Sequence, residues 1–334
     1  MTDSATGSAR GESARPDDPK VGERKKGVRR TVLRYLLAAI ILGCLFLVVP
    51  FSDVVAVMRT ARPEYLLVAL GFSLLSQWLI AVRLRLVVQA LGVDFSTTDL
   101  FSINAATRFY GLFLPGGNVT GIAVRFYKMS GGNGEHAVTA VTLFSERVVA
   151  TLTLCLVGLM FWWLEEPQGM AWLALVMLAG VLATTLLLLL LMGHVSLPVS
   201  LSVDREGRLG RALSRIRDAI QLTRALPKQT LLVVFALSVL IHLVSVLAFL
   251  TIALSMGMNM SFVTMGWIRS GLILAAMIPV SVSGVGLREL AAIILFEGFS
   301  NEAAVAFAIM VFVVTVLVFG LFGGAVEARR YLSR

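Results

Sequence analysis

Residues 230–255 read TLLVVFALSVLIHLVSVLAFLTIALS. This stretch contains no aspartate, glutamate, lysine or arginine, and a helix needs about 20 mostly apolar residues to cross a lipid bilayer. The rest of the chain has the same character, because 57% of its 334 residues are hydrophobic and only 15% are charged. An ordinary soluble domain has about 25% charged residues. The sequence therefore predicts an integral membrane protein.

Other apolar runs resemble this one in length and character. Charged residues border several of them, and we expect Arg83 and Arg85 to end the run that begins at residue 65. The prediction is an all-α polytopic membrane protein with about six transmembrane helices. The five further runs cover residues 31–51, 65–82, 137–164, 170–193 and 302–325.

Two more apolar stretches, 101–128 and 267–298, are interrupted by proline and glycine. Such residues break the helical hydrogen-bond ladder, which membrane proteins tolerate at depth only where protein or a wet cavity surrounds the backbone. We expect two re-entrant helical hairpins, and the alternative is a pair of kinked spanning helices. The expected turn residues are Pro115, Gly116 and Gly117 in the first hairpin, and Pro279, Gly284 and Gly286 in the second.

The basic residues predict the orientation. The chain carries a formal charge of +9, and its lysines and arginines lie mainly in the N-terminal tail, around the first hairpin and in the loop 194–229. The positive-inside rule then places both termini in the cytoplasm. We expect residues 1–30 to be a disordered basic tail and 31–330 to be one transmembrane domain. The loop 194–229 is either an amphipathic helix on the cytoplasmic surface or a solvated connector. The excess of arginine over lysine is typical of a GC-rich bacterial genome, and for this membrane protein we expect the bacterial plasma membrane.

The order of segments suggests an internal repeat. Run 65–82 leads through the first hairpin to run 137–164, and run 230–255 leads through the second hairpin to run 302–325. The first half would cover 31–164 and the second 170–326. In the predicted topology the two hairpins enter from opposite membrane faces, so the halves are inverted. Inverted repeats with broken membrane segments are typical of transporters.

Charged residues near the hairpin turns are candidates for substrate binding. Arg125 follows the first turn, and Arg288 and Glu289 follow the second. A helix that begins at such a turn would offer its N-terminus to an anion, and arginine could bind the phosphate of a lipid. Asn118 and Ser283 lie in the turns themselves. The alternative is that Glu289 only neutralises Arg288.

Run 137–164 carries Glu146 and Arg147 deep within its apolar sequence. An ionisable residue there costs about 2.5–3.5 kcal/mol on insertion scales, so each should face a partner or a wet cavity. A structural ion pair is the alternative. Arg108 lies one helical turn after Asn104, so the two could share a helix face. His242 has no second ligand at metal-binding spacing, and no catalytic motif is present, so we expect no enzyme activity, metal or cofactor.

The sequence PVSVSGVGLRE at 279–289 stands beside two other motifs, Pro-Gly-Gly at 115–117 and Glu146-Arg147. Together they resemble the flippase-like transmembrane family, which forms the membrane part of lysylphosphatidylglycerol synthases and also occurs as free-standing proteins. The resemblance implies a polytopic fold with two re-entrant segments that flips lipids. The synthases add lysine with a C-terminal soluble domain, and this sequence ends at Arg334, so we expect no aminoacyl transfer. Some relatives carry an acidic residue where this chain has Asn118 and Thr120, which leaves the headgroup polarity open.

These features favour a protein that translocates a phospholipid, an aminoacyl-lipid or a lipid-linked glycan. Its expected partners are membrane lipids with anionic headgroups, and nucleic acid is not expected. One alternative is a membrane glycosyltransferase that uses a polyprenyl-phosphate sugar, with Asp53 or Glu64 as the base. The other is an accessory subunit of a lipid or polysaccharide synthase. The oligomeric state stays open.

Overall fold

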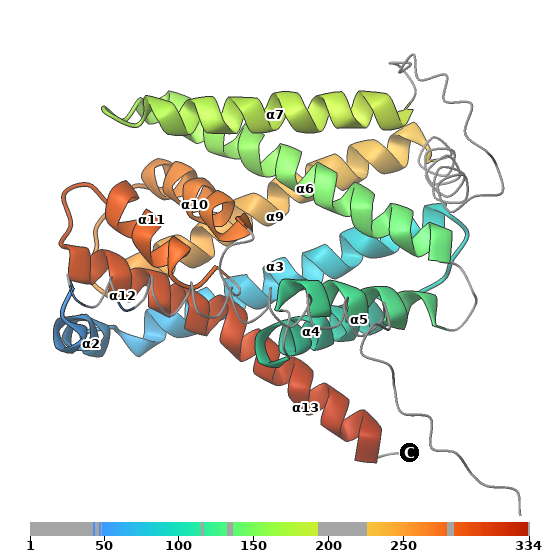
Figure 1. The fold of residues 1–334 in the computed structure, drawn as a ribbon, viewed down its shortest axis with the longest axis horizontal. Coiled ribbons are helices and arrows are strands. Elements are labelled where there is room, and N and C mark those ends of the chain that lie inside the picture. The colour runs from blue at the N-terminus through green and yellow to red at the C-terminus, as the bar shows by residue number, and fades with distance from the viewer. Residues whose placement is uncertain are drawn as a thin grey trace, which may run out of the picture.

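The computed structural model describes residues 49–114, 117–131, 136–192, 226–278 and 284–332, together with Gly43 and Leu47. Within these ranges every regular element is a helix (Figure 1). Five helical segments are long and apolar enough to cross a membrane. They are α3 (Pro63–Ala90), α6 (His136–Glu165), α7 (Ala171–Met192), α9 (Lys228–Ser255) and the continuous run of α12 (Asn301–Phe312), η1 (Val313–Leu317) and α13 (Val318–Leu332).

These five segments confirm five of the predicted spanning runs. The sixth run, 31–51, lies largely outside the described residues, as do the tail 1–30 and most of the loop 194–229. The predicted end of the second run was wrong, because α3 continues past Arg83 and Arg85 to Ala90. Arg83 is only 3% exposed, so its charge lies inside the fold instead of marking a helix end.

The two broken stretches each form a pair of antiparallel helices. In the first pair, a Cβ atom built on Gly121 would lie 2.8 Å from the carbonyl oxygen of Thr107. In the second pair, a Cβ atom built on Gly284 would lie 2.7 Å from the Cβ of Ala276. The chain therefore reverses direction in both stretches instead of continuing as a kinked helix. The first pair is α4 (Thr97–Phe113) with α5 (Asn118–Ser130), and the second is α10 (Phe262–Met277) with α11 (Leu287–Leu295).

Serine side chains begin the first helix of each pair. Ser96 accepts a hydrogen bond from the backbone of Asp99 before α4, and Ser261 accepts one from Thr264 before α10. Such N-caps satisfy backbone donors that the helix itself leaves free. The turn glycines Gly117, Gly284 and Gly286 have φ angles of 56°, 83° and 92°. Residues that carry a Cβ atom rarely adopt φ angles in this range, which explains why glycine occupies these positions.

The helices pack in a crossed arrangement around α3 and α9, which lie along each other at the centre (Figure 1). Ser76 of α3 and Ser245 of α9 are hydrogen-bonded at 3.2 Å across this contact. Helix α4 packs on α13, and α10 packs on α6. Helix α7 also packs on α6, while the short helix α2 (Phe51–Arg59) packs on α12.

Small residues allow two of these contacts to be very close. A Cβ atom on Gly323 of α13 would lie 2.1 Å from the carbonyl oxygen of Ala105 in α4. A Cβ atom on Gly266 of α10 would lie 2.2 Å from the ring of Phe161 in α6. Helices in membranes associate mainly by such tight packing, because lipid gives no hydrophobic drive between them. The glycines thus fix how each helix pair sits on its neighbour.

Candidate functional site

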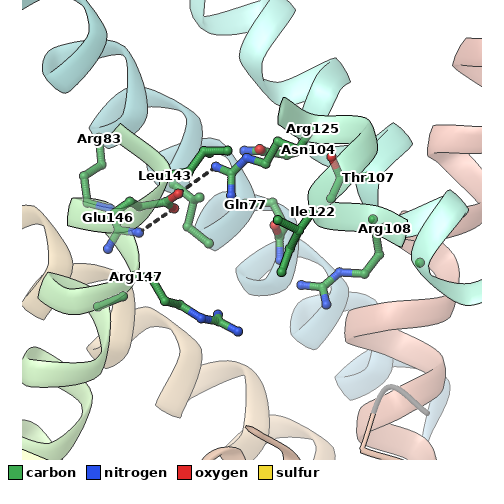
Figure 2. A pocket seen from close by; sticks show the side chains of 14 residues that line it. Gln77, Arg83, Asn104, Thr107, Arg108, Ile122, Arg125, Leu143, Glu146 and Arg147 are labelled. Atoms are coloured by element: carbon green, nitrogen blue, oxygen red, sulfur yellow. Dashed lines mark hydrogen bonds and ion pairs between the residues drawn. The ribbon is translucent and has the colours of Figure 1, made fainter. Parts of the chain in front are cut away.

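A cavity of about 340 Å³ lies between α3, α4, α5 and α6 (Figure 2). We call it the arginine cavity, because four arginines and one glutamate line it together with neutral side chains. Its formal charge is an excess of three positive charges over the single carboxylate. The lining residues are Gln77, Ile80, Arg83, Asn104, Thr107, Arg108, Gly111, Gly121, Ile122, Arg125, Leu143, Glu146, Arg147 and Ala150.

The carboxylate of Glu146 joins two of the arginines. Its Oε1 lies 2.8 Å from Nη2 of Arg83, and its Oε2 lies 2.8 Å from Nη2 of Arg125. Arg83 also donates from Nη1 to the Ser238 hydroxyl of α9 at 2.9 Å. Buried charges are stable only when they are paired and hydrogen-bonded. Glu146 therefore ties α6 to both α3 and α5, and Arg83 extends this network to α9.

The other two arginines have no partner among the described residues. Within the described residues, no hydrogen bond or ion pair involves the side chain of Arg108 or Arg147, and Figure 2 shows these side chains extending from α4 and α6 into the same space. Arg108 is repelled by Arg147 and by Arg125. Mutual repulsion in a partly enclosed site is unfavourable unless an anion offsets it. These two guanidinium groups are thus available to a ligand.

Asn104 supplies a further unsatisfied group. The residue is only 8% exposed, it lines the cavity, and neither its Oδ1 nor its Nδ2 has a hydrogen-bond partner in the described part of the chain. Buried polar atoms are ordinarily satisfied by protein or by an ordered water. Asn104 lies one turn before Arg108, as the shared-face prediction stated, and both contribute to the same cavity. The amide can therefore meet a polar ligand that the arginines hold.

The second helix pair is different, because the two charged residues of α11 neutralise each other. Arg288 Nη2 lies 2.7 Å from Glu289 Oε1, and the two side chains are 5% and 3% exposed. The Glu289 carboxylate also accepts a hydrogen bond from the backbone N–H of Gly286, at the start of α11. The Arg288 guanidinium stacks 5.3 Å from the centre of the Phe312 ring. This contact matches the alternative in which Glu289 neutralises Arg288, and neither residue lines the arginine cavity.

The candidate residues from the sequence thus separate into three groups. Arg108, Arg125, Glu146 and Arg147 meet in the arginine cavity, whereas Arg288 and Glu289 form a separate pair. Asn118 begins α5. The remaining candidates, Pro115, Gly116, Pro279 and Ser283, lie outside the described residues. Arg83 is a cavity residue that the sequence reasoning missed, although the apolar pattern continues beyond it through Leu84, Val87 and Val88.

A further buried cation lies beside the cavity network. Arg269 of α10 is 5% exposed, and its Nη1 is 3.4 Å from Nδ1 of His242 in α9. The Nε2 atom of His242 is 3.1 Å from the Ala150 carbonyl oxygen and 3.1 Å from the Thr153 hydroxyl of α6. Arg269 also stacks on Phe249 at 5.5 Å. In the described residues, no group of three histidine, cysteine or acidic side chains could hold a metal ion.

Comparison with known proteins places the chain in a family. No curated protein matches its sequence. The family model described as the lysylphosphatidylglycerol synthase TM region matches residues 32–323, which include every helix that lines the arginine cavity. With its apolar helices, the match makes this a multi-pass integral membrane protein. Because the match covers most of the sequence, the chain belongs to the lysylphosphatidylglycerol synthase TM region family.

Proposed function

We propose that the protein translocates a lipid between the two leaflets of a membrane and holds the lipid headgroup in the arginine cavity. The observation that carries this proposal is a pair of arginines, Arg108 and Arg147, whose side chains have no partner among the described residues and which line a cavity between helices of a membrane protein. Ionisable groups inside membrane segments are costly, and where they persist they mark pathways for substrates or ions. Membership of a family named for lipid synthases supports a lipid as the cargo.

The surroundings of the cavity suit an amphipathic cargo. Its lining combines the polar residues with apolar ones such as Ile80 and Leu143. On α5, the lining residue Ile122 is 55% exposed and its neighbour Val119 is 60% exposed. An acyl chain can follow this apolar surface into the bilayer while the headgroup stays among the arginines. This division resembles the general design of ligand sites, which combine apolar walls with a few polar groups.

The proposal includes the inverted repeat, with halves 31–164 and 170–326, and hairpins that are re-entrant. The helix contacts support it. The first hairpin helix of one half packs on the last helix of the other, as α4 does on α13 and α10 does on α6. The described helices nearest the start of each half follow the same rule, because α2 packs on α12 and α7 packs on α6. Transporters with inverted repeats expose one site alternately to the two faces.

We place the protein in a bacterial plasma membrane with both termini in the cytoplasm. We propose that it has no enzymatic activity and that its partner is a lipid or polysaccharide synthase. The glycosyltransferase alternative required Asp53 or Glu64 as a base. These residues lie in the first turns of α2 and α3, and neither lines the cavity. We therefore favour translocation.

Leaflet exchange in reconstituted vesicles tests this function. The purified chain is placed in vesicles with a fluorescent phospholipid, and a reductant that cannot cross the membrane quenches only the outer leaflet. Wild-type protein should quench more than half of the signal, whereas the double variant Arg108→Gln, Arg147→Gln should stay close to protein-free vesicles. Arg85→Gln is the matched control, because Arg85 lies on α3 but does not line the cavity. Equal exchange by wild type and the double variant would overturn the proposal.

A further inference from the structure

The carboxylate that lines the arginine cavity is already paired. Glu146 is the single carboxylate among the lining residues, and its two oxygens are bound by Arg83 and Arg125. An aminoacylated lipid headgroup carries ammonium groups, which need carboxylates or other acceptors as partners. Among the described residues, the lining offers no free carboxylate, and their three positive charges in excess would repel such a headgroup. The cavity is therefore unsuited to a cationic headgroup.

Only some of the arginine nitrogens in the cavity have partners. Arg108 and Arg147 lack partners within the described part of the chain, and the Nε atoms of Arg83 and Arg125 have none either. A phosphate diester carries one negative charge, so it would leave two of the three excess positive charges uncompensated. A phosphate monoester carries about −1.5 to −2 at pH 7 and offers three strong acceptor oxygens. Arginine is well matched to such oxygens, because it can donate two parallel hydrogen bonds to them.

The position of the free groups fits such an anion. Arg108 and Arg147 extend from α4 and α6, so a phosphate between them can use a different oxygen for each (Figure 2). Asn104, buried and unpaired on the α4 wall, can donate to a third oxygen or to a neighbouring phosphate. The volume of about 340 Å³ exceeds what one phosphate fills. A diphosphate or a phosphate with a small substituent would also fit.

We infer that the headgroup bound by the arginine cavity is a phosphate monoester or a diphosphate with at least two negative charges, and not an aminoacylated headgroup. This inference deepens the proposed function and rests on it for the lipid nature of the ligand. Of the three cargo classes expected from the sequence, the inference excludes the aminoacyl-lipid. It restricts the phospholipids and the lipid-linked glycans to those whose phosphate groups carry at least two negative charges.

Binding measurements with lipids of equal acyl chains test the inference. The purified full chain in detergent is titrated with dioleoyl phosphatidic acid as the monoester, dioleoyl phosphatidylglycerol as the diester, and the lysyl ester of the latter. We expect phosphatidic acid to bind at least about tenfold more tightly than phosphatidylglycerol, because its second negative charge adds a charge-assisted hydrogen bond to an arginine. The lysyl ester should bind most weakly. Arg108→Gln should remove most of the preference, and Arg85→Gln should retain it.

Soluble anions separate a lipid site from a site for free phosphate. Glycerol 3-phosphate and inorganic pyrophosphate are titrated in the same assay. Both should compete with phosphatidic acid, but glycerol 3-phosphate should bind far more weakly, because it lacks the acyl chains. If it binds as tightly as phosphatidic acid, the ligand is a soluble phosphate and the inference is wrong. Equal affinity for the three lipids, or tightest binding of the lysyl ester, would also overturn it.

The two proposals can fail separately. Leaflet exchange of fluorescent analogues of the same three headgroups is measured in vesicles beside the binding assay. Exchange of all three at equal rates would support translocation and overturn the headgroup inference. Preferential binding of phosphatidic acid that depends on Arg108, without exchange of any lipid, would support the headgroup inference and overturn translocation.

Discussion

Arg83 and Glu146 form a buried ion pair, with Nη2 of the arginine 2.8 Å from Oε1 of the glutamate. The two residues are 63 positions apart in the sequence and connect α3 to α6. The same carboxylate holds Arg125 of α5, so three helices around the cavity share one negative charge. Removing that charge would leave two guanidinium groups buried without a counter-ion, which makes Glu146 the residue on which the cavity wall depends.

Glu146→Gln should therefore destabilise the protein. Breaking one side of a buried ion pair costs about 3–5 kcal/mol, because the remaining charge stays desolvated. Thermal unfolding in detergent should show a clear drop in midpoint. Glu64→Gln is the control, since Glu64 is exposed at the start of α3 and should change little. An unchanged midpoint for Glu146→Gln would show that the pair does not support the fold.

Arg108→Gln should leave the stability of the protein intact and impair leaflet exchange, in contrast to Glu146→Gln. Arg108 has no protein partner within the described residues and is repelled by Arg147, so its neutralisation removes no contact and relieves repulsion. We expect an equal or higher unfolding midpoint together with reduced leaflet exchange. Arg83→Gln should lower both quantities, because Arg83 pairs with Glu146 and Ser238. If Arg108→Gln lowers stability but leaves exchange intact, Arg108 has a structural role.

The contrast between Arg83 and Arg108 also shows what the sequence can predict. Spanning helices follow from composition, because bilayer thickness sets the length of the apolar run. Arg83 was interpreted as the end of such a run, since arginines usually gather where a helix leaves the membrane. Its true environment depends on Glu146 and Ser238, which are distant in sequence. Only the packing of α3 against α6 and α9 could place that charge inside.

The two hairpins also show that local sequence does not determine the environment of a charged side chain. Their similar Pro and Gly content predicted that each hairpin, at residues 113–121 and 278–289, offers a helix N-terminus and an arginine to an anion. In the first hairpin, Arg125 reaches a carboxylate on another helix and lines the cavity. In the second, the neighbour Glu289 turns back to the start of α11 and neutralises Arg288. The similar local sequences therefore acquire different roles through the side chains that surround them.

Gly323→Ala should weaken the contact between α13 and α4. The new Cβ atom would lie 2.1 Å from the Ala105 carbonyl oxygen, which belongs to a helix backbone and cannot rotate away. Overpacking of this kind costs about 1–3 kcal/mol. Gly71→Ala in α3 is the matched control, because nothing lies within 4 Å of its Cβ position, and it should stabilise the helix by about 0.5–1 kcal/mol. Equal midpoints for the two variants would contradict the packing argument.

Two carboxylates connect the two proposed halves of the protein, and each lies near the end of the last helix of its half. Glu327 of α13 accepts hydrogen bonds from Lys128 Nζ at 2.8 and 2.9 Å and from the Tyr110 hydroxyl at 3.3 Å. Glu165 of α6 accepts hydrogen bonds from Trp267 Nε1 and from the Thr264 hydroxyl, each at 2.7 Å. Glu327 thus holds the first hairpin, and Glu165 holds the second. In an inverted repeat these contacts lie at opposite membrane faces.

Neutralising each carboxylate should therefore change access to the arginine cavity in opposite directions. In a chain with Cys44→Ser and Cys155→Ser, the variant Ile122→Cys places a thiol in the cavity lining, and its labelling by a charged reagent measures access. Glu327→Gln frees the hairpin that carries this thiol, so labelling should rise. A partly exposed ion pair contributes up to about 1 kcal/mol, which corresponds to a change of up to about fivefold in the labelling rate.

Glu165→Gln favours opening of the other hairpin. If the two halves alternate, labelling at Ile122→Cys should then fall. If both variants raise the labelling rate, the two contacts act independently and the halves do not alternate.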